Sequence, residues 1–326
     1  MKILGIGNAL VDILVQLDDE STLQNLFLPK GSMQLIQQED IPAITHSIEN
    51  LPAVMVSGGS AANTIHGIAS LGMSCGYIGK VGNDEMGKFY AKDFYDAGVN
   101  TNLLHSKTVT GRAYTFVTPD SERTFATYLG AAIELTAQDL NPKSFEGYDL
   151  LHVEGYLVQN TSLIETALNI AKSKGMSTSL DLASFNVVKD SLDFLSEIIP
   201  KYVDIVFANE EEAKAYTGKD PHFALSEIAS HCNIAIVKTG KEGSLIRTGD
   251  EKLEIGIIPV SAIDTTGAGD QYAAGFLYGF LKNLSLNKCG EIGALLAGKV
   301  IENYGARIPQ NLWAGILREV NSIIHA

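Results

Sequence analysis

Cysteine is scarce in this sequence, which has only Cys75, Cys232 and Cys289 among 326 residues. They lie far apart and form no CxxC pair, so neither a disulfide framework nor a zinc site is predicted, and a reducing cytoplasm is the expected location. Long apolar runs are missing too, because no stretch approaches the ~18–20 apolar residues of a membrane span. The start, MKILGIGNALVDILV, has polar residues within its apolar stretch and no small-residue cleavage pattern after it, so it does not predict a signal peptide.

Positive charge is also scarce. Lys and Arg number 24 against 38 Asp and Glu, which gives a formal net charge of -14 and a pI near 4.9. An acidic surface repels the phosphate backbone, so non-specific nucleic-acid binding is not expected. A polyphosphate ligand would therefore need a local pocket of backbone amides, a few cations or a metal ion.

The chain is rich in short apolar runs that alternate with helical patterns such as 60–72 and 161–175. Several runs are apolar throughout, as in strands that are covered on both faces of a parallel sheet. This order predicts an α/β fold with a doubly wound, mainly parallel sheet and helices on both faces, in a single domain over 1–326. The predicted strands are 2–7, 53–59, 75–82, 148–156, 177–183, 204–209 and 234–240.

Two stretches interrupt this alternation. Residues 16–50 are polar, with a strand-like MQLIQ but no clear crossover helix, and residues 105–128 contain YTFVT and ERTFATY, which alternate apolar and polar positions. They predict a small antiparallel β excursion that acts as a lid. Such a lid would either stay free in a monomer or pair with another copy in a homodimer.

Open α/β sheets bind ligands at the carboxyl ends of their strands, so the loops there are the candidates. The first, GIGNALVD, lacks the third glycine of a dinucleotide fingerprint and continues as a strand, so a nicotinamide site is not indicated. Asp12 places a carboxylate in an apolar segment, where burial costs free energy unless the group is paired or bound. Either this side chain faces outward from a strand or it has a function, and the sequence leaves both open.

The second loop, SGGSAANT, contains Gly58 and Gly59, which allow the backbone to approach a ligand closely. Ser60 suits a helix N-cap, and Asn63 would face back over the same helix start. A well-capped turn from strand to helix explains these residues structurally, and ligand binding is the alternative.

Two later loops also have two interpretations each. In NEEEA, Asn209 and Glu212 have the spacing of a capping box, but the carboxylate could also organise a hydrated magnesium ion beside phosphates. In KTGKEGS, Thr239, Gly240 and Gly243 offer a hydroxyl and backbone amides for phosphate contact, or a tight hairpin into GSLIRTG.

The loop DTTGAGD at 264–270 gives the strongest signal. Gly267 and Gly269 free the backbone, and the run DQYAAGFLYGFL predicts a helix, so the amides of 267–269 would form an anion site at its N-terminus. Asp270 lies in the first turn of that helix. Beside a bound anion, this carboxylate can accept the proton of an attacking hydroxyl, which is what phosphoryl transfer requires.

Over nearly its whole length the chain resembles the PfkB (ribokinase) family of carbohydrate and nucleoside kinases. DTTGAGD matches the second signature of that family, and SGGSAANTIHGIASLG with GYIGKVGNDEMG matches the first. Within the family, GIGNALVDI and KGSMQLI are most similar to adenosine-kinase-like members.

The resemblance implies ATP and magnesium as cofactors and a role for each matching residue. Asp270 would be the catalytic base. The anion hole for the transferred phosphoryl group would consist of Gly267, Ala268 and Gly269. Asn209 and Glu212 would organise the magnesium ion and its waters beside ATP, whose site would be lined by Thr239, Gly240 and Gly243.

The same resemblance implies a substrate site under the lid. Its contacts would come from Asp12, Gly58, Gly59 and Asn63, and from Tyr156, an aromatic ring placed against the nucleobase. Arg123 of the lid would reach either the phosphates or the substrate. The expected activity is ATP-dependent phosphorylation of a primary hydroxyl of an adenosine-like nucleoside or a sugar.

Two alternatives to this activity are a free-sugar kinase for ribose, fructose or a sugar acid, and a catalytically silent nucleotide- or sugar-binding regulator on the same fold. Retention of Asp270 and both loop glycines weighs against the regulator, because a protein that only binds its ligand needs no base.

Overall fold

Two β-sheets organise the computed structural model, which describes residues 1–120 and 122–326. The larger sheet has nine strands in the order β14-β13-β12-β11-β10-β9-β1-β5-β6, and all neighbours from β12 to β6 are parallel. The expected doubly wound, mainly parallel sheet is confirmed. Its strands are β1 (Ile3–Ile6), β5 (Cys75–Gly82), β6 (Asn100–Ser106), β9 (Leu150–Glu154), β10 (Ser177–Asp181), β11 (Ile205–Asn209), β12 (Ile234–Lys238), β13 (Ser244–Thr248) and β14 (Glu251–Ile255).

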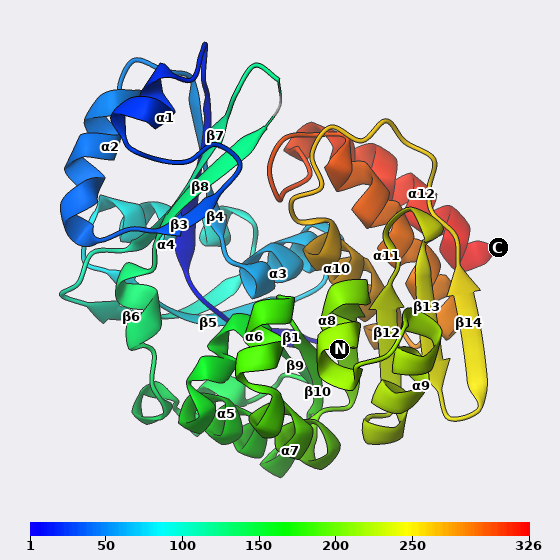
Figure 1. Cartoon of the computed structure of the whole chain (residues 1–326). Coiled ribbons are helices and arrows are strands. Elements are labelled where there is room, and N and C mark those ends of the chain that lie inside the picture. The colour runs from blue at the N-terminus through cyan, green and yellow to red at the C-terminus, as the bar shows by residue number, and fades with distance from the viewer. Residues whose placement is uncertain (121) are drawn as a thin grey trace.

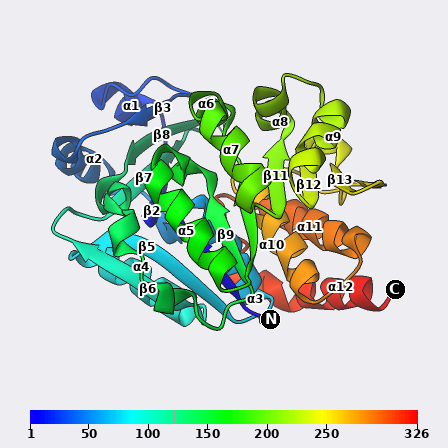
Figure 2. The ribbon, with the colours of Figure 1, turned by 90° about the horizontal axis from the view of Figure 1, so that it is seen from below.

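Helices cover both faces of this sheet, which explains the apolar runs of strands such as β11 and β12. In β11, Ile205 and Phe207 pack into one core with α3, α10 and α11, while Val206 and Ala208 pack into the other with α5 to α9 (Figure 2). Within the described residues, no helix has the length and apolar character needed to cross a membrane. The helices are α1 (Ser21–Asn25), α2 (Ile41–Ile48), α3 (Ser60–Ser70), α4 (Glu85–Asp96), α5 (Thr161–Ser173), α6 (Phe185–Asp190), α7 (Leu192–Tyr202), α8 (Glu210–Thr217), α9 (Pro221–His231), α10 (Ala268–Leu281), α11 (Leu286–Ile301) and α12 (Trp313–His325).

The second sheet, called the small sheet below, projects from the main body together with α1 and α2 (Figure 1). It is mixed rather than purely antiparallel, because β2 pairs with β7 and β3 pairs with β8 in parallel. In β2, alternate residues Val11, Ile13 and Val15 are buried, so one face of this sheet packs on a core. Its strands, in spatial order, are β3 (Met33–Leu35), β8 (Arg123–Tyr128), β7 (Gly111–Val117), β2 (Leu10–Gln16) and β4 (Ala53–Gly58).

The small sheet extends beyond the two segments from which the lid was predicted. The run 53–59 was predicted as a strand of the main series, but it forms β4 and pairs antiparallel with β2. The segment 16–50 contains two helices, α1 and α2, although no clear helix was predicted there. Short amphipathic helices give a weak sequence signal because only a few side chains, such as Leu23 and Ile44, enter the core.

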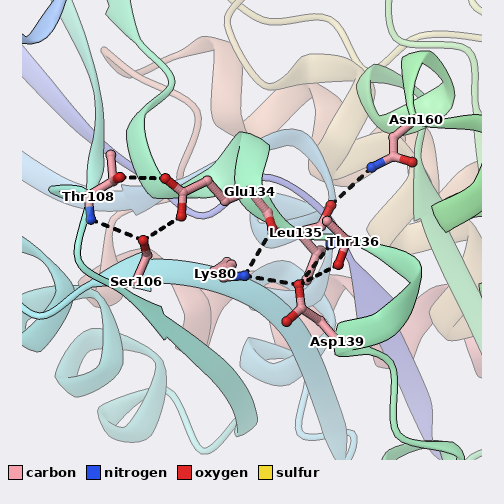
Figure 3. A network of polar contacts seen from close by, with 8 residues as sticks. All are labelled: Lys80, Ser106, Thr108, Glu134, Leu135, Thr136, Asp139 and Asn160. Atoms are coloured by element: carbon pink, nitrogen blue, oxygen red, sulfur yellow. Dashed lines mark hydrogen bonds and ion pairs between the residues drawn. The ribbon is translucent and has the colours of Figure 1, made fainter.

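A polar network joins the two sheets where the chain leaves β6 for β7 and returns after β8 (Figure 3). The Lys80 ammonium of β5 donates to the Glu134 carbonyl and to Asp139 Oδ2, each at 2.9 Å. The Glu134 carboxylate in turn accepts hydrogen bonds from the Ser106 and Thr108 hydroxyls. The base of the small sheet is therefore held to the carboxyl ends of β5 and β6.

Candidate active site

The helix α10 begins one residue after a glycine that no other residue could replace without strain. Gly267 caps it with φ of 75°, in the left-handed region. A Cβ at this position would lie 2.5 Å from the Ala306 Cα, so both the backbone angle and the space require glycine. Asp270 consequently lies in the first turn of α10, with the amides of 267–269 before it. The Ala268 amide also donates to the Thr265 carbonyl at 3.2 Å, so it would serve an anion as a shared donor.

The Asp270 carboxylate is half-buried and is held by the start of α3. The Ser60 hydroxyl donates to its Oδ1 at 2.8 Å, and Asn63 Nδ2 donates to its Oδ2 at 2.9 Å. Ser60 was predicted as the N-cap of α3, but Gly59 takes that position with no side-chain cap, because the hydroxyl is directed to Asp270. Burial raises the pKa of Asp270 to about 7, against the opposing effect of the Asn63 bond.

Asp12 of β2 lies against the bare backbone of the glycine pair. A Cβ on Gly58 would lie 2.2 Å from the Asp12 Cγ, and one on Gly59 would lie 2.1 Å from the Asn8 carbonyl oxygen. Burial raises the pKa of Asp12 to about 7, and the positive charge of Arg307 opposes this rise. The carboxylate of Asp12 and that of Asp270 therefore flank the turn between β4 and α3.

Arg307 is a buried residue that the sequence interpretation did not identify. Its Nη1 donates to Asp93 Oδ2 at 2.7 Å, and its Nη2 donates to the Ser57 carbonyl and, at 2.6 Å, to the Ser57 hydroxyl. Ser57 directly precedes the glycine pair, so this arginine fixes the end of β4. Nothing in the sequence pairs positions 93 and 307, which are 214 residues apart.

A cavity of about 610 Å³ is lined in part by Thr265, Ala268 and Gly269 of the segment 264–269, called the anion loop below. Apolar residues from the segment after β14 and from α11 form much of its wall, including Ile257, Ile258 and Ala297. Gly240 and Gly243 also line it, and the hairpin interpretation of their loop is confirmed because β12 and β13 pair antiparallel. Thr239 is buried in this hairpin, where its amide donates to the Gly243 carbonyl at 2.8 Å.

Asn209 and Glu212 form the reciprocal capping box that their spacing predicted. The Asn209 amide and side chain donate to the two carboxylate oxygens of Glu212 at 2.7 Å each, and the Glu212 amide donates to Asn209 Oδ1 at 2.8 Å. Burial, followed by the charge of Asp181, raises the pKa of Glu212 to about 7. No cluster of three metal-ligating side chains occurs in the part of the chain that the structure describes. The Glu212 carboxylate offers oxygen donors, which suit Mg²⁺ held through waters.

Arg123 reaches from β8 of the small sheet to the loop before α10. Its Nη1 donates to Asp264 Oδ1 and to the Thr266 hydroxyl. The Asp264 carboxylate is 1% exposed and also accepts from the amides of Thr266 at 2.7 Å and Gly305 at 2.8 Å. The structure thus places the Arg123 guanidinium beside the anion loop, at the residue before Gly267.

Tyr156 follows β9 in a single 3₁₀ turn, Gly155–Gln159, and is 45% exposed. Partial burial, and then the charges of Glu154 and Asp270, raise the pKa of Tyr156 to about 12. Glu154 was missed at the sequence level. It is 1% exposed and accepts hydrogen bonds from Asn8 Nδ2 at 2.7 Å and the Ala61 amide at 3.1 Å. The feature of the sequence that could have identified Glu154 is its position as an acidic residue at the end of the apolar run LLHVE.

The chain is similar to known proteins over most of its length. Residues 33–313 match the profile of the pfkB family carbohydrate kinases. A nucleoside kinase of Methanocaldococcus jannaschii is 30% identical over 289 residues, which cover 86% of this chain and 91% of that protein. The crystal structure of adenosine kinase from Sinorhizobium meliloti is 37% identical, with a TM-score of 0.86 and 98% of each chain covered. A probable sugar kinase from Rhizobium etli is 34% identical, with a TM-score of 0.87 and 99% of each chain covered.

Proposed function

The chain belongs to the pfkB family of carbohydrate kinases, and from this premise we propose that it transfers a phosphoryl group from ATP to the primary hydroxyl of an adenosine-like nucleoside. That it is a phosphotransferase acting on a sugar or nucleoside hydroxyl follows from the family itself. The observation that carries the nucleoside assignment is Tyr156, an exposed aromatic ring in the turn after β9, two residues beyond Glu154, which accepts a hydrogen bond from the Ala61 amide at the start of α3. An aromatic ring can stack on a purine, a contact that a free sugar does not need.

In this proposal Asp270 is the general base. When bound, ATP supplies the phosphoryl group: the acceptor oxygen bonds to the γ-phosphorus while the bond to the bridging oxygen breaks, and ADP leaves with that electron pair. The acceptor hydroxyl gives its proton to Asp270, which Ser60 and Asn63 hold in position. The amides of 267–269 lie at the positive end of α10 and would stabilise the charge on the phosphoryl oxygens. Asp12 would hold a further hydroxyl of the acceptor.

Arg123 and the small sheet would keep water away from this reaction. An exposed phosphoryl group beside a base would be hydrolysed as readily as transferred. The small sheet carries Asp12 on β2, where it lies against Gly58, and Arg123 on β8, which bonds to Asp264 and Thr266 before α10. We infer that this sheet is the lid, with 16–50 and 105–128 as its main segments.

Glu212→Gln tests whether Glu212 organises magnesium. If it does, we expect the Mg²⁺ concentration for half-maximal rate to rise several-fold, because an amide binds metal-bound water less strongly than a carboxylate. The cap geometry is preserved in part by the glutamine oxygen. Steady-state rates over a magnesium titration measure this, with Glu211→Gln on the solvent side of the same helix as the matched control. An unchanged titration would limit Glu212 to its capping role.

The acceptor itself is tested by ATP consumption with adenosine, other nucleosides, ribose and fructose. We expect wild type to prefer adenosine, and Tyr156→Ala to raise the KM for adenosine by roughly three- to tenfold through loss of stacking. The same variant should leave any activity on free ribose nearly unchanged. Tyr95→Ala, an exposed tyrosine on α4, is the matched control and should behave as wild type.

A free-sugar kinase is the second candidate, because Asp12 against Gly58 would hold the hydroxyls of a free sugar equally well. Good turnover of ribose or fructose with none of adenosine would replace the nucleoside assignment by this one. The phosphoryl-transfer chemistry would be the same.

A further inference from the structure

Lys238 is a buried cation that the mechanism above does not use. It ends β12, its side chain is 16% exposed, and its Nζ donates to Asp181 Oδ2 at 3.0 Å. A Cβ on Gly269 would lie 3.0 Å from this Nζ, so the ammonium group lies directly on the anion loop. Both Lys238 and Gly269 line the cavity of about 610 Å³.

The Asp181 carboxylate contacts this ammonium group, and the charges of Glu212 and Asp270 also act on it. Burial alone would lower the pKa of Lys238, but the charges of Asp181, Glu212 and Asp270 together raise it above its ordinary value. The group is therefore protonated at neutral pH. A triphosphate that approached the anion loop would meet these carboxylates unless a cation compensated for them, and the Lys238 ammonium group lies at the loop, between Asp181 and Gly269.

A purely structural role explains this position poorly. Desolvation offsets most of the Coulomb energy of a buried ion pair, so the pair with Asp181 contributes little to stability. A structural pair would also have no reason to face a cavity or to lie against a glycine of the anion loop. The ammonium group can instead exchange part of its contact with Asp181 for a phosphate oxygen, as lysine does in other phosphate sites.

We propose that Lys238 binds the terminal phosphate of ATP, next to the amides of Gly267 and Gly269. We assign Lys238 to the terminal phosphate rather than to the other two because, in the proposed mechanism, the amides of Gly267 and Gly269 bind the phosphoryl group that is transferred. The inference rests on the proposed use of ATP but not on the identity of the acceptor.

The test compares nucleotide binding to Lys238→Met and wild type by calorimetry, with MgAMP-PNP and MgADP as probes and no acceptor present. We expect the variant to bind the triphosphate analogue at least tenfold more weakly and MgADP within about threefold of wild type, with kcat lower by roughly 10²–10³-fold, as for loss of one donor to transition-state charge. Lys238→Arg keeps the positive charge, so it should retain more of the affinity for the triphosphate analogue and more of kcat than Lys238→Met does.

Lys172→Met is the matched control, because Lys172 forms a partly buried pair with Asp204 at 2.6 Å at the amino ends of the strands. It should lose stability without any selective loss of the triphosphate analogue. Since Lys238→Met leaves Asp181 without its partner, the double variant Lys238→Met/Asp181→Asn repeats the test without an unpaired carboxylate. If both nucleotides bind to these variants as they do to wild type, Lys238 is only the partner of Asp181. The acceptor panel decides separately whether the nucleoside assignment stands.

Discussion

Asp270→Asn is expected to lower kcat by roughly 10²–10⁴-fold, the usual share of a general base, while nucleotide and acceptor binding stay within a few-fold of wild type. The amide keeps the size of the side chain and can still bond to Ser60, but it cannot accept the proton of the acceptor hydroxyl. Steady-state rates and calorimetric affinities separate the two effects. Near-wild-type kcat would remove Asp270 from the mechanism.

The pH dependence of the melting temperature of this variant tests whether it is folded and whether the effect of the substitution is local. Burial raises the pKa of Asp270 to about 7, so the folded protein holds this proton more tightly than the unfolded chain does. The stability that comes from the protonated form is present at low pH and is lost as the pH rises through about 7. The substituted amide cannot ionise, so the gain in Tm of Asp270→Asn over wild type should be larger at pH 8 than at pH 5. The exposed Asp250, replaced by Asn, should show no such difference.

Arg307→Met is expected to cost about 3 kcal/mol in the free energy of unfolding, because removing one partner leaves a buried polar cluster uncompensated. The guanidinium group is 8% exposed and Asp93 is 29% exposed, which places the effect at the lower end for buried pairs. Ser57 loses a donor to its carbonyl at the same time. Urea denaturation followed by circular dichroism measures the change.

Two further variants identify the cause of that loss. Arg307→Met/Asp93→Asn removes both charges and should recover part of the stability, since no unpaired carboxylate remains. Arg318→Met, on the exposed side of α12, should change stability by less than about 0.5 kcal/mol. Equal effects at 307 and 318 would mean that the Ser57–Asp93 cluster contributes nothing to the fold.

Features that depend on a residue and its near neighbours in the chain could be predicted from the sequence. Strands β11 and β12 are apolar up to their last residues because helices cover both of their faces, and each strand shows this burial in its own sequence. The capping box of Asn209 and Glu212 could be predicted because its two partners are only three residues apart in the chain. The start of α10 at DTTGAGD required only glycine flexibility followed by a helical run. In contrast, β6 and β14 at the edges of the sheet are half-exposed and mixed in polarity, so no apolar run marked them.

The contacts between distant segments were decided by packing alone. Asp270 meets Ser60 across 210 positions because α3 and α10 lie together on one face of the sheet, and Arg307 meets Asp93 across 214. Lys238 reaches Asp181 and Gly269 only because β12 and β10 end at the same edge. A side chain's type and its near neighbours specify which bonds it can make, but which partner it finds depends on strand order and helix placement. Those arise from the burial of the whole core, to which each residue contributes only a small part.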